Sequence, residues 1–82
     1  MAELARSPEQ IGNVIRRARK RRGMNQSELG EKAGLRQETI SLIENGNPAA
    51  KLETVLAVLS ALGLELRINE RSTKDLFEEI LP

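Results

Sequence analysis

The sequence predicts a mainly α-helical domain that ends in one short β-strand. Four segments repeat apolar residues at helical spacing between capping residues and glycines, which is typical of amphipathic helices. A fifth segment, "LELRIN" at 64–69, instead alternates apolar and polar residues, which is typical of a half-buried strand. A chain of 82 residues makes one domain and buries only about 60% of the surface that its unfolded form exposes. Since it has no cysteine for a disulfide, we expect a second chain to support the fold.

The first helix is expected to follow an N-terminal arm, residues 1–7. In "SPEQ", Ser7 can cap the helix and Pro8 can occupy its first position. Gln10 can reach back to the Ser7 N–H and complete a capping box. Gly23 ends the helix. Its apolar face is formed by Ile11, Val14, Ile15 and Ala18.

The second and third helices are expected to be short. Asn25 can cap the second helix with Glu28 at the capping-box position, and Gly34 can end it in the left-handed conformation. The third helix should span about 36–45 and stop before "GNP" at 46–48. The inward residues are expected to be Leu29 and Ala33 in the second helix, and Leu35, Ile40 and Ile43 beside or within the third.

The two short helices are expected to form a helix-turn-helix. Helices of about ten residues or fewer are marginal in water, so packing must hold both. With a compact turn at Gly34, the first of the two braces the second, which can then enter a DNA major groove about 12 Å wide. Gly30 agrees with this: glycine inside a helix costs about 1 kcal/mol relative to alanine, so we expect the third helix to approach closely there.

The fourth helix, about 51–62, is the most apolar, and Gly63 closes it. Because each lies three or four residues from another member of the set, five residues are expected to share one inward face: Leu52, Val55, Leu56, Leu59 and Leu62.

The strand has no partner strand in the sequence, so its backbone groups would be left unpaired. Two copies can satisfy each other by pairing antiparallel about a two-fold axis at Leu66. Leu64 then lies opposite Ile68 of the mate, and Glu65 lies opposite Arg67. We therefore expect a homodimer in which the apolar face of the paired strands covers the fourth helices.

Charge is unevenly distributed, although the formal net charge is only +1. Residues 1–35 hold eight Lys and Arg against four Asp and Glu, whereas 36–82 hold five against eight. Six of the basic residues lie within 16–22. Such a cluster is typical of a phosphate-binding surface, and equally of a solvated helix face.

The residue inventory argues against catalysis. Histidine and cysteine are absent, and the sequence has no phosphate-binding loop or clustered carboxylates, so we expect no enzyme, no metal site, no cofactor and no small-molecule ligand. The longest apolar run, 55–59, is far below the roughly 20 residues of a membrane helix, and no signal segment starts the chain. We expect a cytoplasmic protein.

The stretch "GMNQSELGEKAGLRQETISLIENG", 23–46, resembles the XRE family of helix-turn-helix DNA-binding proteins, which includes the lambdoid phage repressors and Cro. The resemblance covers about 11–62 and implies a lambda-repressor-like bundle of four to five helices that represses transcription. With "ALGLELRINERS" after it, the layout is similar to HipB-type antitoxins, which repress their own operon and bind a HipA-type serine/threonine kinase toxin. A dimer implies a palindromic double-stranded operator with half-sites about one DNA turn apart.

Four polar residues of the third helix should share the face opposite its two isoleucines: Arg36, Gln37, Glu38 and Ser41. Gln37 can form two hydrogen bonds with adenine, Glu38 can accept one from cytosine N4, and Ser41 can bond any base. Arg36 can reach guanine or a phosphate. The resemblance implies base reading at the positions of Gln37, Glu38 and Ser41. The alternative for Gln37 and Glu38 is that they only suit the polarity of a helix start.

Contacts to the DNA backbone are expected around these residues. The resemblance makes Gln26 a phosphate clamp. Asn45 and Lys51 flank the loop after the third helix, where exposed amides can meet phosphates, although the same residues also serve as a helix stop and turn. Arg19 and Glu44 match a pair that forms an ion bridge in related repressors, and Arg19 could also touch phosphate.

Residues 70–82 are expected to form an acidic C-terminal tail, and 8–69 the domain itself. "DLFEEIL" could form a short helix that binds the toxin through Leu76, Phe77, Ile80 and Leu81, with Phe77 as anchor; a disordered end is the alternative. Two other functions stay open: a free-standing XRE regulator without a toxin, and an adaptor that binds proteins through the same fold. The adaptor predicts no salt-sensitive affinity for DNA.

Overall fold

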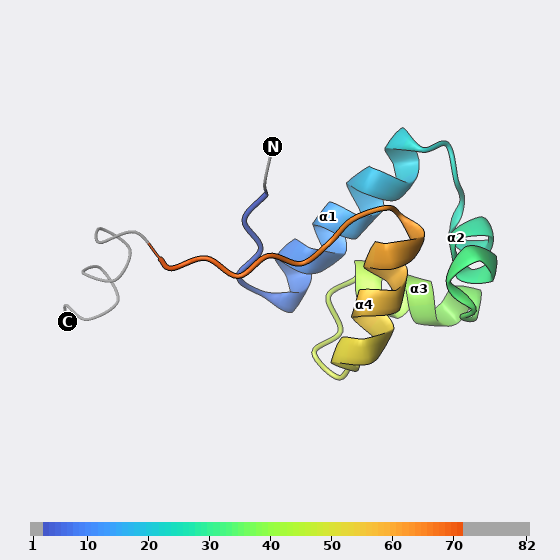
Figure 1. The fold of residues 1–82 in the computed structure, drawn as a ribbon. Coiled ribbons are helices and arrows are strands. Elements are labelled where there is room, and N and C mark those ends of the chain that lie inside the picture. Colours follow the sequence, from blue (N-terminus) through green and yellow to red (C-terminus); the bar gives the residue numbers. More distant parts are fainter. Residues whose placement is uncertain (1–2, 72–82) are drawn as a thin grey trace.

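The computed structural model describes residues 3–71, which contain four α-helices (Figure 1). They are α1 (Pro8–Arg21), α2 (Gln26–Ala33), α3 (Gln37–Glu44) and α4 (Leu52–Ala61). The predicted helices are confirmed, with bounds within about two residues of those expected. Among the described residues, no helix is long and apolar enough to cross a membrane. The predicted tail helix and its Leu76, Phe77, Ile80 and Leu81 lie outside the described residues.

The helix starts follow the predicted capping chemistry with one exception. Asn25 and Glu28 form the complete capping box at α2, through bonds of 2.8 and 2.9 Å. At α1 the Ser7 Oγ accepts a 3.1 Å bond from the Gln10 N–H, as expected. The Gln10 side chain, however, accepts from the Arg6 N–H instead of the Ser7 N–H. The predicted bond from the Ser7 N–H to Gln10 was therefore wrong, because the chain enters α1 with the Arg6 N–H, and not the Ser7 N–H, directed at the Gln10 side chain.

The core lies where all four helices meet. All four helices contribute buried side chains, and so does Leu62, the C-cap of α4. The buried apolar residues are Ile15, Ala18, Leu29, Ile40, Ile43, Val58, Leu59 and Leu62. The inward residues of α2 and α3 are as predicted, with Leu29 and Ile40 fully buried and Ile43 4% exposed. Neither short helix has a core of its own, so each is stable only in contact with the others.

The predicted inward face of α4 was partly wrong. Leu52 and Leu56 are 66% and 42% exposed, whereas Val58, which the prediction omitted, is fully buried. Leu59 and Leu62 are buried as expected. α4 has two apolar stripes, and spacing alone does not show which of them faces the neighbouring helices. The stripe with Val58 faces the core, and the stripe with Leu52 and Leu56 is left on the surface.

The segment after α4 runs extended past α1 (Figure 1). Leu64 packs against the core, while Leu66 and Ile68 are 54% and 92% exposed. Within residues 3–71 the structure has no β-strand. A strand requires hydrogen bonds to a second strand, so one chain does not test the cross-subunit pairing, which stays a prediction. Glu65 and Arg67 lie on one side of the segment and pair with each other at 3.1 Å.

Candidate nucleic-acid interface

The turn between α2 and α3 is tight and depends on two glycines. Gly34 has φ +73°, in the left-handed region, and ends α2. The Leu35 N–H then donates to the Gly30 carbonyl at 2.8 Å. A Cβ added to Gly30 would lie 2.7 Å from the Leu35 carbonyl oxygen. The close approach predicted at Gly30 is therefore confirmed, although the approaching group belongs to the turn before α3 and not to α3 itself.

The outward face of α3 consists of the polar residues that the sequence analysis selected. Arg36, Gln37 and Glu38 are exposed at its start, and Ser41 is half-buried one turn later. They project away from the core because the two isoleucines on the other side of the helix are buried. The helix is only two turns long, so its exposed polar residues lie close together near its N-terminal end. This is the end of a recognition helix that contacts base edges in helix-turn-helix proteins.

A chain of side-chain hydrogen bonds fixes the orientation of Gln37. The Gln26 Nε2 donates to the buried Glu44 Oε1 at 3.2 Å, so the Gln26 Oε1 faces outward. That oxygen accepts from the Gln37 Nε2 at 2.7 Å. One N–H and the Oε1 of Gln37 are left for a ligand, and these are the donor and acceptor that adenine N7 and N6 require. The predicted phosphate clamp and the predicted base-reading residue are thus in direct contact.

Glu44 anchors this chain of bonds in the core. Its carboxylate accepts from the Arg19 Nε at 2.6 Å and from the Arg19 Nη2 at 2.9 Å, which confirms the ion pair implied by the resemblance. Burial by itself raises the pKa of the Glu44 carboxyl, but the hydrogen bonds from Arg19, Gln26 and Arg16 and the charge of Arg19 lower it below its usual value. The Glu44 hydrogen bond in turn raises the pKa of Arg19. The pair therefore stays charged in the folded protein.

The phosphate contact expected for Arg19 is not supported. Arg19 is only 8% exposed, and its Nη1 donates to the Met24 carbonyl at 2.9 Å in addition to the bonds that it makes with Glu44. Arg19 therefore ties α1 to the turn before α2 and to the end of α3, which are structural contacts.

Arg16 is a residue that sequence reasoning missed. It belongs to the basic cluster at 16–22 and the sequence predicts no specific partner for it, but its Nε lies 3.3 Å from the Glu44 Oε1. Its Nη2 donates to the Glu44 carbonyl at 3.3 Å and to the Asn45 Oδ1 at 3.2 Å, at the negative end of the α3 dipole. Gly12 was the available signal: a Cβ there would lie 2.5 Å from the Ile43 carbonyl oxygen, so α1 needs glycine to approach the end of α3.

The other predicted backbone contacts lie on the surface after α3. Asn45 caps the C-terminal end of α3, is exposed, and donates from Nδ2 to the Ser41 Oγ at 3.5 Å. Lys51 is exposed at the N-cap of α4. Both side chains are therefore accessible from solvent.

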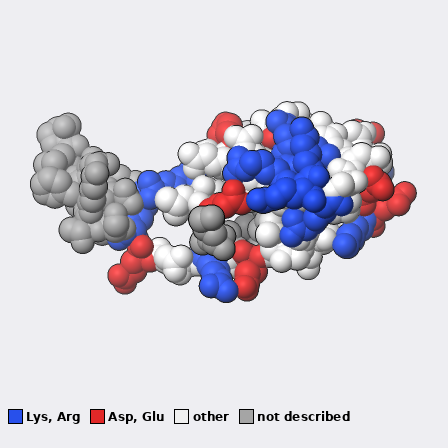
Figure 2. All heavy atoms as spheres, turned by 90° about the horizontal axis from the view of Figure 1, so that it is seen from above, with Lys and Arg blue, Asp and Glu red and all other residues white. Residues whose placement is uncertain are grey.

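Basic side chains gather over α1 in the view of Figure 2. Two of them, Arg17 and Arg21, contact the Glu3 carboxylate of the N-terminal arm at 2.7 and 3.7 Å. The hydrogen bond from Arg17 lowers the pKa of the Glu3 carboxyl. Basic side chains therefore form a surface over α1 in this view, and Glu3 of the N-terminal arm neutralises part of its charge.

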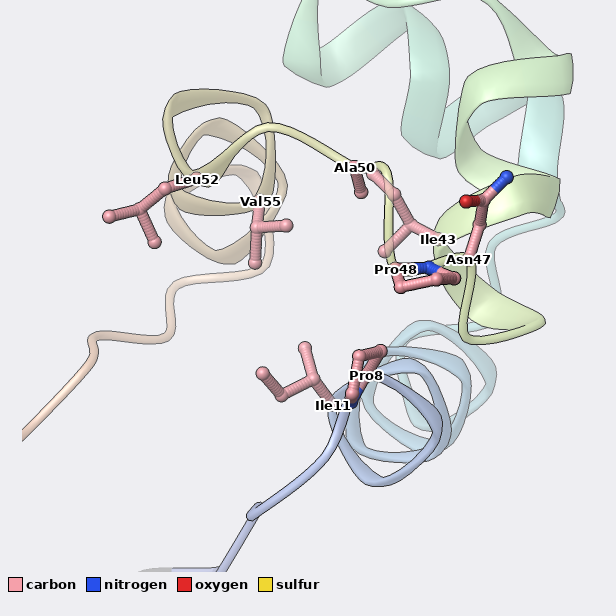
Figure 3. Close-up of a pocket in the computed structure, with 8 residues that line it drawn as sticks. All are labelled: Pro8, Ile11, Ile43, Asn47, Pro48, Ala50, Leu52 and Val55. Carbon is pink, nitrogen blue, oxygen red and sulfur yellow. The ribbon is translucent and has the colours of Figure 1, made fainter.

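The surface beside α4 is mainly apolar, although charged residues of the arm and of the segment after α4 also line it. A hollow of about 180 Å³ lies between the start of α1, the end of α3 and the start of α4, and Asn47 is the polar residue among the eight that line it (Figure 3). A larger groove of about 720 Å³ shares Ile11, Leu52 and Val55 with this hollow and extends to Ile68. We call the combined surface the α4 groove. Within residues 3–71 no three His, Cys, Asp or Glu side chains are placed to hold a metal.

Comparisons with known proteins agree with this geometry. A helix-turn-helix family model matches residues 15–69. Antitoxin HipB of Escherichia coli is 37% identical over 62 residues, which cover 76% of this chain and, in strains CFT073 and K12, 66% and 70% of the relative. In the first of these strains the match thus spans slightly less than two thirds of the relative. An uncharacterized HTH-type transcriptional regulator of Sinorhizobium fredii, y4mF, is 37% identical over 68 residues, 83% of this chain and 90% of its own length.

A solved structure of similar fold belongs to the HipA-HipB-O2-O3 complex. It has a TM-score of 0.80 and 32% sequence identity, and the match covers 87% of this chain and 100% of that one. The matched residues include α2, α3 and the tight turn between them, so the helix-turn-helix of the structure lies within the family match. The chain belongs to the XRE-type helix-turn-helix family.

Proposed function

We propose that this chain is a sequence-specific DNA-binding repressor, and the antitoxin of a HipA-type kinase pair whose operon it represses. Its similarity to HipB antitoxins and to the HipB chain of the HipA-HipB-O2-O3 complex supports this function. The observation that carries it is the outward face of α3, where Gln37 is held in one orientation by Gln26 and Glu44. A repressor of this kind acts in the bacterial cytoplasm, where the chromosome lies.

The proposed base contacts follow from what each side chain has free. Gln37 offers one N–H and one oxygen to adenine, and Glu38 accepts from cytosine N4. Ser41 bonds a base one helical turn later, and Arg36 reaches guanine or phosphate. The carboxylate of Glu38 would repel phosphates, so it requires a cytosine donor opposite it. Phosphate contacts are assigned to Gln26, Asn45 and Lys51.

The proposed homodimer explains the α4 groove. Leu52, Leu56, Leu66 and Ile68 are large apolar side chains that one chain leaves exposed around it. Residues 65–69 make no backbone hydrogen bond to another described residue, so the segment can pair with its copy in a mate. In this arrangement the arm, 1–7, and the tail, 70–82, flank a domain at 8–69. Their bounds and the toxin-binding role of the tail are part of the proposal.

A Leu66→Asp substitution tests the dimer. It places two charges at the two-fold axis of the paired strands, so sedimentation is expected to show a monomer. A Glu31→Gln variant, changed at an exposed residue of α2 that does not line the α4 groove, should remain dimeric. An unchanged dimer in the Leu66→Asp variant would contradict the strand pairing.

Titration of DNA tests the binding function. If each subunit contacts about four phosphates, log affinity should fall against log salt with a slope of about −7. Replacing Gln37 with Ala should cost about 1 to 3 kcal/mol at one base pair per half-site and little elsewhere. Glu31→Gln, an exposed change at the far end of α2, is the matched control. A flat salt dependence would favour the adaptor function, and uniform weakening across all sequences would refute the role of Gln37.

The toxin partner needs a separate experiment. Coexpression with a HipA-type kinase from an adjacent reading frame should yield a complex that remains associated through gel filtration. Binding to DNA without any such complex would leave a free-standing regulator as the function.

A further inference from the structure

We infer that Leu42 is a specificity-determining residue that recognises the C5-methyl group of a thymine in each operator half-site. The inference deepens the proposed DNA-binding function and rests on it. Leu42 is the exposed large apolar residue of α3: its exposed fraction is 52%, whereas Ile40 and Ile43 on the same helix are 0% and 4% exposed.

The position of Leu42 places it among the proposed base-reading residues. It lies four residues after Glu38, hence about one turn further along the same side of the helix, and next to Ser41 in the sequence. Four residues correspond to about 6 Å of helix, and base pairs are spaced about 3.4 Å apart. Leu42 should therefore face a base pair one or two steps from the one that Glu38 contacts.

Leu42 contributes neither to the core nor to the α4 groove. Leu42 belongs neither to the buried core nor to the partly buried residues packed against it. It also lines neither part of the α4 groove, which accounts for Leu52, Leu56, Leu66 and Ile68. Its apolar side chain thus has one neighbouring surface to meet, the ligand of the α3 face.

The chemistry of the major groove then selects the occupant. Base edges there present hydrogen-bond donors and acceptors, and the thymine methyl is the apolar group among them. A leucine has no hydrogen bond to offer a base, but it can cover that methyl and remove it from water. Burial of one such group is worth about a fourfold change in affinity, or about fifteenfold when both half-sites of a dimer are changed.

Uracil substitution tests the inference because uracil differs from thymine only by this methyl. A 20-base-pair duplex is first selected from random DNA by binding to the full chain. Each thymine in both half-sites is then replaced in turn by uracil, and affinities are measured for the natural chain, Leu42→Ala and the control Glu31→Gln, which lies outside both α3 and the α4 groove. The natural chain and Glu31→Gln are expected to lose about fifteenfold at one symmetric thymine pair, and Leu42→Ala to lose nothing there.

Three outcomes would overturn the inference, and they separate it from the proposed function. Specific binding without a uracil effect at any position, or selected half-sites without thymine, would show that Leu42 recognises no methyl. An equal uracil effect in Leu42→Ala would assign the methyl contact to another residue. Failure to select any duplex over random DNA would instead overturn the DNA-binding function itself.

Discussion

Separating the buried pair of Arg19 and Glu44 should reveal how strongly this pair joins α3 to α1. We consider Arg19→Met and Glu44→Leu singly and together. The Glu44 side chain is fully buried and the Arg19 side chain is 10% exposed, so either single change leaves a charge without its main partner in a site that excludes water. Breaking such a pair costs about 3 to 5 kcal/mol.

The remaining contacts decide where each variant falls within that range. Without Arg19, the Glu44 carboxylate keeps the longer contacts from Arg16 at 3.3 Å and Gln26 at 3.2 Å. Without Glu44, the Arg19 guanidinium keeps only its bond to the Met24 carbonyl among those described above. Glu44→Leu should therefore be the more damaging single change. In the double variant apolar groups replace both charges, so its loss should be about 2 to 3 kcal/mol smaller than the sum of the single losses.

Urea unfolding followed by far-ultraviolet circular dichroism measures the cycle. All four proteins are compared at pH 7 and at one protein concentration, because dimerisation would make stability concentration-dependent. At about 0.05 to 0.15 kcal/mol per residue, a chain of 82 residues is stable by about 4 to 12 kcal/mol. A loss of about 3 to 5 kcal/mol should therefore lower the urea midpoint of each single variant severely, and unfold the chain without urea if its stability is at the low end of this range. Losses that add within about 0.5 kcal/mol would refute the conclusion that the two charges depend on each other.

Three further predictions concern stability. The pKa of Glu44 is lower in the folded chain than its ordinary value of 4.5, so the unfolded chain binds the proton first as the pH falls. The free energy of unfolding should therefore fall as the pH drops through 4.5. Glu44→Gln, which has no carboxyl to titrate, should flatten this part of the profile. Gly30→Ala should destabilise the fold by about 1 to 2 kcal/mol, because its Cβ would meet the Leu35 carbonyl. Glu31→Ala, at the next and exposed position, should change the stability by no more than about 0.5 kcal/mol. A stabilised Gly30→Ala variant would contradict the close approach. Ser7→Ala should lower the melting temperature through the loss of an N-cap worth about 1 kcal/mol, and an unchanged value would show that this cap does not stabilise α1.

The sequence by itself determined the helices and the polarity of the outward face of α3. Capping residues and glycines act on the adjacent backbone, so Asn25, Glu28 and Gly34 predicted the limits of α2 without knowledge of the remaining chain. Helical spacing likewise separated the isoleucines of α3 from Gln37 and Glu38. Capping and helical spacing each depend only on residues within or next to one helix, so they can be recognised without knowing how the helices pack.

Only the tertiary structure decided which surfaces meet. Spacing could not show that α4 buries Val58 and exposes Leu52, because both stripes are apolar and the choice depends on the angle between packed helices. Nor could it place Arg16 against Glu44, 28 residues away. The orientation of Gln37 follows from bonds to α2 and, through Gln26, to the end of its own helix, so the donor and acceptor that it presents exist only once the helices have packed together.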